Sequence, residues 1–145
     1  MTTLYLDTSS LLKIYVAEDG SDVVRQELAG CAAAATSAVT YAEARAAFAR
    51  RRRDGTLTAA VFRAATRDFD EDWPRYLVVE ATMAVCRKAG ELAERHALRG
   101  FDSLHLAAFL QVVRDTPSSE VRFSSFDHDL NRAAALALRA MRRSG

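Results

Sequence analysis

The chain has 145 residues, half of them hydrophobic, and 20 Lys and Arg against 19 Asp and Glu, so it suits one globular domain and excludes an intrinsically disordered chain. The two cysteines, Cys31 and Cys86, are far apart and have no Cys or His at ligand spacing, which argues against a disulfide scaffold and a zinc site. No apolar run predicts a signal peptide or a membrane span, so we expect one cytoplasmic domain over residues 1–145 with no membrane contact.

Short β-prone runs alternate with longer stretches of helical periodicity along the chain. The predicted strands are 3–6, 76–79 and 121–124, and the predicted helices are 9–17, 21–29, 39–54, 59–72, 81–98, 104–113 and 130–138. Residues 32–36 are ambiguous, because their composition favours a helix whereas their length and the following Thr36-Ser37 favour a short buried strand. We expect Val23 and Val61 on the buried faces of their helices, and Gly90 to interrupt or thin its helix. The helix over 104–113 is apolar nearly all round and is therefore predicted to be buried.

This alternation predicts the fold class. Short apolar strands separated by helices form a mostly parallel sheet that is covered on both faces. We therefore expect an α/β protein, a three-layer α/β/α sandwich with a short central sheet. In such sheets ligands bind at the carboxyl ends of the strands, so the residues at those ends are the candidate site.

Four acidic residues lie at strand ends or helix starts. Asp7 follows the first predicted strand, Asp127 follows the last, Glu43 lies early in the helix after Ser37, and Asp102 begins a helix. Each acid alone has a second interpretation as a helix cap, a partner of the helix dipole or a turn residue. As a group they indicate a metal site instead, because clustered carboxylates in apolar surroundings repel one another unless a divalent cation neutralises them. An all-oxygen ligand set without Cys or His favours Mg²⁺, with Mn²⁺ as a substitute.

The same residues carry a resemblance to a known family. The segments that carry it are Leu6-Asp7-Thr8-Ser9-Ser10-Leu11-Leu12, Tyr41-Ala42-Glu43, Gly100-Phe101-Asp102-Ser103-Leu104-His105-Leu106-Ala107 and Ser124-Ser125-Phe126-Asp127. In this order and spacing they resemble the four acidic motifs of the PIN-domain ribonucleases, and the short single-domain form is similar to the VapC toxins of type II toxin–antitoxin systems. The resemblance covers essentially the whole chain.

The resemblance implies a PIN-like fold and a metal-dependent endoribonuclease that hydrolyses RNA phosphodiester bonds to leave a 5′-phosphate and a 3′-hydroxyl. It places Asp7, Glu43 and Asp102 in the catalytic metal site, with Asp127 as a fourth, more variable acid. Ser9 matches a supporting hydroxyl, and Ser125 stands where the family more often has Thr. It also implies a cognate antitoxin protein and a homodimer as partners.

Two nearby residues are assigned outside this site. Asp129 matches a position that is usually outside the metal shell, and we interpret His105 as a core histidine because its helix is buried on several faces. The aromatic series Phe62, Phe69, Trp73 and Tyr76 is interpreted mainly as core packing.

The one strong basic cluster consists of Arg50, Arg51, Arg52 and Arg53. It predicts an RNA-backbone contact and equally suits the solvated last turn of a helix. The alternative to the toxin is a catalytically silent PIN-like module that binds RNA or a partner, and a third interpretation keeps the acids as caps only.

Overall fold

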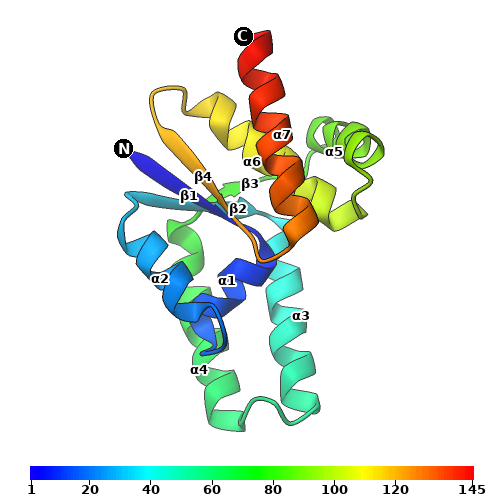
Figure 1. Cartoon of the computed structure of the whole chain (residues 1–145). Helices are drawn as coiled ribbons and strands as arrows, with labels where there is room; N and C mark the ends of the chain where they lie inside the picture. Colours follow the sequence, from blue (N-terminus) through cyan, green and yellow to red (C-terminus); the bar gives the residue numbers. More distant parts are fainter.

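The computed structural model describes residues 1–145 and contains one four-stranded, fully parallel sheet with the strand order β3-β2-β1-β4 (Figure 1). The elements are β1 (Thr2–Leu6), α1 (Thr8–Tyr15), α2 (Ser21–Ala29), β2 (Ala33–Ser37), α3 (Val39–Arg53), α4 (Ala59–Asp72), a 3₁₀ turn (Trp73–Arg75), β3 (Leu77–Val79), α5 (Met83–His96), α6 (Gly100–Asp115), β4 (Glu120–Ser124) and α7 (His128–Ser144). The predicted three-layer fold is confirmed.

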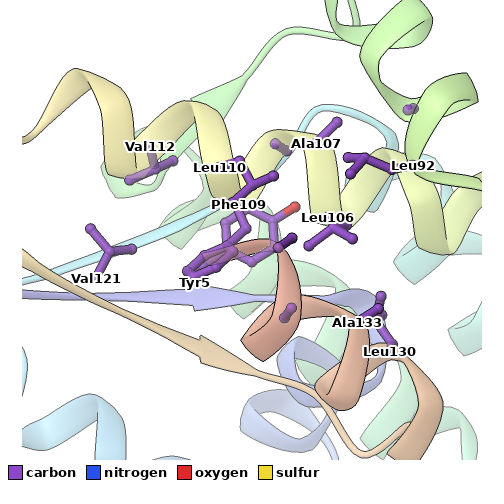
Figure 2. Close-up of a cluster of buried hydrophobic side chains, with 14 of the residues drawn as sticks. Tyr5, Leu92, Leu106, Ala107, Phe109, Leu110, Val112, Val121, Leu130 and Ala133 are labelled. Atoms are coloured by element: carbon purple, nitrogen blue, oxygen red, sulfur yellow. The ribbon is translucent and has the colours of Figure 1, made fainter. Parts of the chain in front are cut away.

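Side chains alternate between the two faces of the central strand β1, as strand geometry requires. Tyr5 points into a core formed with α5, α6 and α7, which Figure 2 shows around the rings of Tyr5 and Phe109. Leu4 and Leu6 point into a second core formed with α1 to α4, where Phe48 and Phe69 are fully buried. The two helical layers therefore cover opposite faces of one sheet.

The sheet register places the strand ends side by side. Leu6, the last residue of β1, pairs with Ser124, the last residue of β4. The next residue, Asp7, donates its backbone N–H to the Ser124 carbonyl oxygen at 3.1 Å. The segments that follow β1 and β4 consequently leave the sheet at the same edge. Asp7 and Asp127, which lie on these segments, are therefore brought to the same side of the molecule.

Several local predictions were wrong in detail. Val23 is 53% exposed and Val61 43% exposed. In α2 the fully buried residue is the neighbouring Val24, and consecutive helical residues point about 100° apart. Val61 lies in the first turn of α4, at the end of the α3–α4 hairpin that extends away from the sheet (Figure 1).

Two helix extents also differ from the prediction. Helix α5 runs without interruption through Gly90, which shows that packing against α6 outweighs the low helix propensity of glycine. Helix α7 is longer than predicted because it continues to Ser144, with Arg142 and Arg143 in its last turn, where cations favour the helix dipole.

No helix combines the length and apolar character needed to cross a membrane.

Candidate active site

The four predicted acids converge on one pocket of about 270 Å³ at the carboxyl edge of the sheet. It is lined by Asp7, Thr8, Ser9, Glu43, Asp102, His105, Phe126 and Asp127. These residues come from α1, α3, α6 and the segments that follow β1 and β4, and no Lys or Arg is among them. The sequence-based expectation that four acids distant in the chain share one cavity therefore agrees with the structure.

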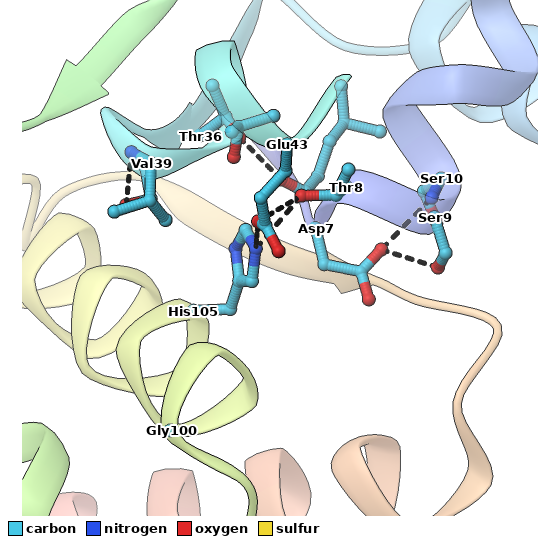
Figure 3. Close-up of polar contacts among 12 residues, drawn as sticks. Asp7, Thr8, Ser9, Ser10, Thr36, Val39, Glu43, Gly100 and His105 are labelled. Carbon is cyan, nitrogen blue, oxygen red and sulfur yellow. Dashed lines mark hydrogen bonds and ion pairs between the residues drawn. The ribbon is translucent and has the colours of Figure 1, made fainter. Parts of the chain in front are cut away.

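Asp7 is held by the start of α1, of which it is the N-cap residue. Its Oδ1 accepts hydrogen bonds from the Ser10 backbone N–H at 3.0 Å and from the Ser9 hydroxyl at 2.7 Å (Figure 3). The residue is only 5% exposed, and its Oδ2 has no hydrogen-bond partner in the protein. One oxygen of the Asp7 carboxylate thus caps helix α1, and the other is free to face the pocket.

Asp127 repeats this arrangement at the start of α7. Its Oδ1 accepts from the Leu130 backbone N–H at 2.9 Å, which makes it the N-cap, and its Oδ2 has no protein partner. Ser125 supports the turn rather than the pocket, since its hydroxyl accepts the Asp127 backbone N–H at 3.0 Å. Asp129 lies exposed in the first turn of α7 and does not line the pocket.

Glu43 is oriented through one of its two oxygens. The Thr8 hydroxyl donates to Glu43 Oε1 at 2.6 Å, and His105 Nε2 lies 3.1 Å from the same oxygen (Figure 3). Burial acts to raise the pKa of Glu43, but the hydrogen bonds from His105 and Thr8, with the charge of His105, outweigh burial and lower it. Glu43 Oε2 is left without a protein partner.

His105 connects Glu43 to the buried core. Its Nδ1 lies 2.9 Å from the hydroxyl of Tyr5, a residue that is 0% exposed and has no other hydrogen-bond partner for this group. His105 thus lies with Nδ1 on the Tyr5 hydroxyl and with Nε2 on Glu43 Oε1 and, at 3.2 Å, on the Thr8 hydroxyl oxygen. The interpretation of His105 as a buried residue is correct, but it also lines the pocket and contacts Glu43.

Asp102 lies in the first turn of α6, and its side chain makes no hydrogen bond. Its pKa is raised, first by burial and then by the neighbouring carboxylates of Asp127 and Asp7, against the opposing charges of His105 and Arg99. The raised pKa agrees with the placement of Asp7, Asp102 and Asp127 in one pocket, where like charges repel one another.

The residues fit a divalent cation in chemistry, although no three of the acidic, His or Cys side chains stand close enough to form a complete ligand set. Four carboxylates each present at least one oxygen that no protein group uses, and Asp102 presents both. Free carboxylate oxygens in a pocket that no Lys or Arg lines are the ligands that Mg²⁺ and Mn²⁺ prefer. Asp7, Glu43, Asp102 and Asp127 are therefore the residues that would hold such an ion.

The predicted basic cluster lies elsewhere. Arg50 to Arg53 form the last turn of α3, about 10–15 Å along the helix axis from Glu43, and none of them lines the pocket. Arg51 donates to Glu18 Oε2 at 2.9 Å, and Arg52 lies 3.5 Å from the Leu57 carbonyl oxygen.

Sequence reasoning missed Thr8 and Phe126 as pocket residues and the contact of His105 with Glu43. The signal for Thr8 and Phe126 was their place next to Asp7 and Asp127, whereas nothing in the local sequence of His105 indicates a partner 62 residues away.

Comparison with known proteins identifies the family of the chain. The sequence matches the PIN domain family over residues 4–136. It is 40% identical over 112 residues to Ribonuclease VapC45 and to Ribonuclease VapC49, both of Mycobacterium tuberculosis, with 77% of this chain and 78% of each relative covered.

Two solved structures share the fold. A chain of the crystal structure of FitAcB from Neisseria gonorrhoeae superimposes with a TM-score of 0.63 at 18% identity, covering 91% of this chain and 93% of that one. A chain of VapBC2 from Rickettsia felis, bound to a DNA fragment from their promoter, gives a TM-score of 0.53 at 14% identity, covering 85% and 99%. Fold, acidic pocket and sequence match together show that the chain belongs to the PIN-domain family, with VapC ribonucleases among its relatives.

Proposed function

We propose that the chain is a Mg²⁺-dependent endoribonuclease toxin whose catalytic site is the pocket of Asp7, Glu43, Asp102 and Asp127. The observation that carries this proposal is the convergence of four carboxylates with free oxygens on one pocket that no Lys or Arg lines. The relatives named ribonucleases VapC45 and VapC49 support RNA as the substrate. PIN-domain nucleases generally use divalent metals, which supports a metal at this pocket.

The protein's own residues set the geometry of the reaction. The helix starts of α1 and α7 fix the Asp7 and Asp127 carboxylates through their capping oxygens, and the contacts of Thr8 and His105 fix Glu43. A bound divalent cation supplies a water of lowered pKa and neutralises the charge that develops on the phosphate. In its absence the acids repel a phosphodiester, so RNA binding here depends on the metal.

Basic residues outside the pocket are needed to hold the RNA backbone. We assign this role to the cluster of Arg50, Arg51, Arg52 and Arg53, although Arg51 is already paired with Glu18. Reversing the charge of the cluster weakens RNA binding and lowers its salt dependence, because fewer counterions are released on binding. If the charge-reversed variant shows the same salt dependence of RNA binding as the wild type, the cluster does not contact RNA.

A cognate antitoxin and a homodimer complete the proposal, and the likeness to VapC toxins supports both. An antitoxin Arg that reaches Asp7 or Asp102 forms a charge-assisted pair with the carboxylate and competes with the metal. The same free oxygens that suit a cation suit a guanidinium, so inhibition needs no change in the pocket.

RNA-end sequencing tests the function. Cells briefly expressing the wild type are compared with cells expressing Asp7→Asn or Asp102→Asn, and purified proteins are assayed with Mg²⁺ and with EDTA. We expect new 5′-phosphate ends only with the wild type, and a loss of cleavage in vitro of roughly two orders of magnitude or more for both variants and for EDTA. Asp129→Asn is the matched control, because it removes an exposed acid just outside the pocket and should cleave like the wild type.

The silent-module alternative predicts a different pattern. A protein that binds RNA without cutting it yields no new ends from the wild type, and its RNA binding is insensitive to EDTA. That result would refute the proposed endoribonuclease activity.

A further inference from the structure

Two exposed phenylalanines directly precede acids of the pocket. Phe101 comes before Asp102 and is 57% exposed, and Phe126 comes before Asp127 and is 46% exposed. The other five phenylalanines of the chain are buried or half-buried. Single exposed apolar residues are common on protein surfaces, so exposure alone assigns no role. The position of both rings beside the acids calls for an explanation.

Phe126 lines the acid pocket and is held in place from three directions. The Lys13 ammonium lies 4.6 Å from the ring centroid, and the ring contacts Gly20, where a Cβ would stand only 2.7 Å from Phe126 Cε1. The Phe126 backbone N–H donates to the Ser9 hydroxyl at 3.3 Å, and that hydroxyl donates to Asp7. The ring is thus fixed relative to Asp7 before any ligand arrives, which reduces the entropy lost on stacking.

Phe101 lines a larger pocket of about 740 Å³ that shares Glu43 and Asp102 with the acid pocket. Its wall on α5 consists of small residues, Ala89, Gly90 and Ala93. Arg99 is the one Lys or Arg that lines either pocket; it is exposed and forms no ion pair. A ring, a shallow wall of small residues and a free guanidinium together match a nucleotide, which has a flat base and an anionic phosphate.

We propose that Phe101 and Phe126 are stacking platforms for unpaired bases of the RNA strand that passes through the acid pocket, with Arg99 binding a backbone phosphate beside Phe101. This inference rests on the proposed ribonuclease function and adds the residues that hold the bases and a phosphate of the substrate. Bases within a duplex are already stacked on one another, so the two rings select single-stranded segments.

RNA binding is measured first without cleavage, in an Asp7→Asn background that keeps three of the four acids, with Mg²⁺ at a concentration that saturates RNA binding. The probes are an unstructured, fluorescein-labelled RNA of mixed sequence and the same RNA annealed to its complement, followed by fluorescence polarisation. Phe101→Ala and Phe126→Ala should each weaken binding of the single strand about 5- to 150-fold, the range expected for loss of one base stack. Phe101→Tyr and Phe126→Tyr should restore it, and Arg99→Gln should lower its salt dependence. The matched control is Leu136→Ala, which truncates an exposed apolar residue of α7 that lines neither pocket.

Cleavage kinetics in the otherwise wild-type chain give the second readout. We expect the alanine variants to raise KM and leave kcat within a few-fold, because neither ring carries a group that can bind the metal or stabilise charge on the phosphate. Two results would refute the stacking role and point to a protein partner for the two rings. One is that the alanine variants bind single-stranded RNA as tightly as their parent does, and the other is that duplex RNA binds as tightly as single-stranded RNA. Failure of the ribonuclease is recognised separately, since the chain carrying Asp7 would then show no metal-dependent cleavage of any RNA.

Discussion

At the scale of single residues, the site depends on how each carboxylate divides its two oxygens. One oxygen of Asp7, Glu43 and Asp127 accepts hydrogen bonds from the protein, and the other has no partner. Asp7 and Asp127 are therefore helix caps and pocket residues at once, so the two interpretations of these acids are compatible. A carboxylate fixed through one oxygen keeps the other in place with little loss of side-chain entropy on metal binding.

His105 should affect activity through Glu43. Replacing it by Leu removes the donor to Glu43 Oε1 and leaves the buried Tyr5 hydroxyl unpaired, whereas Gln keeps an N–H that can reach Glu43. We expect His105→Leu to lower the cleavage rate about 10- to 100-fold, as loss of a residue that orients a metal ligand does, and His105→Gln to recover part of it. The measurement is the initial rate against Mg²⁺ concentration, with the melting temperature as a check on folding. Equal activity of the Leu variant at every Mg²⁺ concentration would refute a positioning role.

The raised pKa of Asp102 makes the metal-free protein less stable at neutral pH. Between the pKa of Asp102 in the unfolded chain and its raised pKa in the folded chain, the folded state holds more protons, so stability falls as the pH rises. Asp102→Asn removes this penalty. Because Asp102 is partly exposed and the α6 dipole favours its charge, we expect a gain of only about 0.5 kcal/mol at pH 7, or roughly 1–2 °C in melting temperature.

Thermal unfolding in EDTA from pH 3 to pH 8 measures this effect, and the gain should vanish at the acidic end. Adding Mg²⁺ should reverse the order, since ligand binding stabilises the chain that keeps its acids. Asp129→Asn, also in the first turn of a helix but outside the pocket, serves as the control and should show no gain. Identical pH profiles for Asp102→Asn and the wild type would show that the acids do not interact.

At the scale of elements, two acids of the pocket lie at the boundaries between strands and helices. Helices α1 and α7 begin two and four residues after the last residues of β1 and β4, and their caps are Asp7 and Asp127. The sequence predicted both helix starts to within two residues, because a β-prone run ending in Asp, Ser or Thr is a local signal. Whether a glycine breaks a helix was not decided locally, as α5 shows at Gly90.

Two glycine-to-alanine substitutions should have opposite effects. Gly90 lies inside α5, and a Cβ there would meet nothing within 4 Å, so Gly90→Ala should stabilise the protein by about 0.5–1 kcal/mol. Gly20 has a φ of +91°, and a Cβ would clash with the Phe126 ring, so Gly20→Ala should destabilise it by at least about 1 kcal/mol. Urea unfolding of both variants measures the difference. A destabilised Gly90→Ala variant would contradict an open α5 surface.

At the scale of the whole molecule, one sheet joins two hydrophobic cores that lie on its opposite faces. Tyr5 and its neighbours Leu4 and Leu6 contribute to different cores from the same strand. The two helical layers therefore cannot separate without exposing β1, and we expect them to unfold together.

Matched core truncations test this cooperativity. Leu11→Ala lies in the core of α1 to α4 and Leu92→Ala in the core of α5 to α7, and each should cost about 2–5 kcal/mol. The single tryptophan, Trp73, packs only against the first core, so its fluorescence reports that layer while far-UV circular dichroism reports both. Coincident urea transitions by the two probes are expected for both variants. A Trp73 transition that Leu92→Ala leaves unshifted would show two independent folding units.

The sequence by itself determined the order of strands and helices, the α/β class and the four acids at element ends, because propensity, periodicity and capping act over a few residues. Only the tertiary structure decided which face of each helix is buried and which side chains distant in the sequence come into contact. It exposed Val23, placed Arg51 against Glu18 and brought His105 between Tyr5 and Glu43. These contacts depend on how complete elements dock on one another, and docking is governed by burial summed over both cores rather than by local pattern.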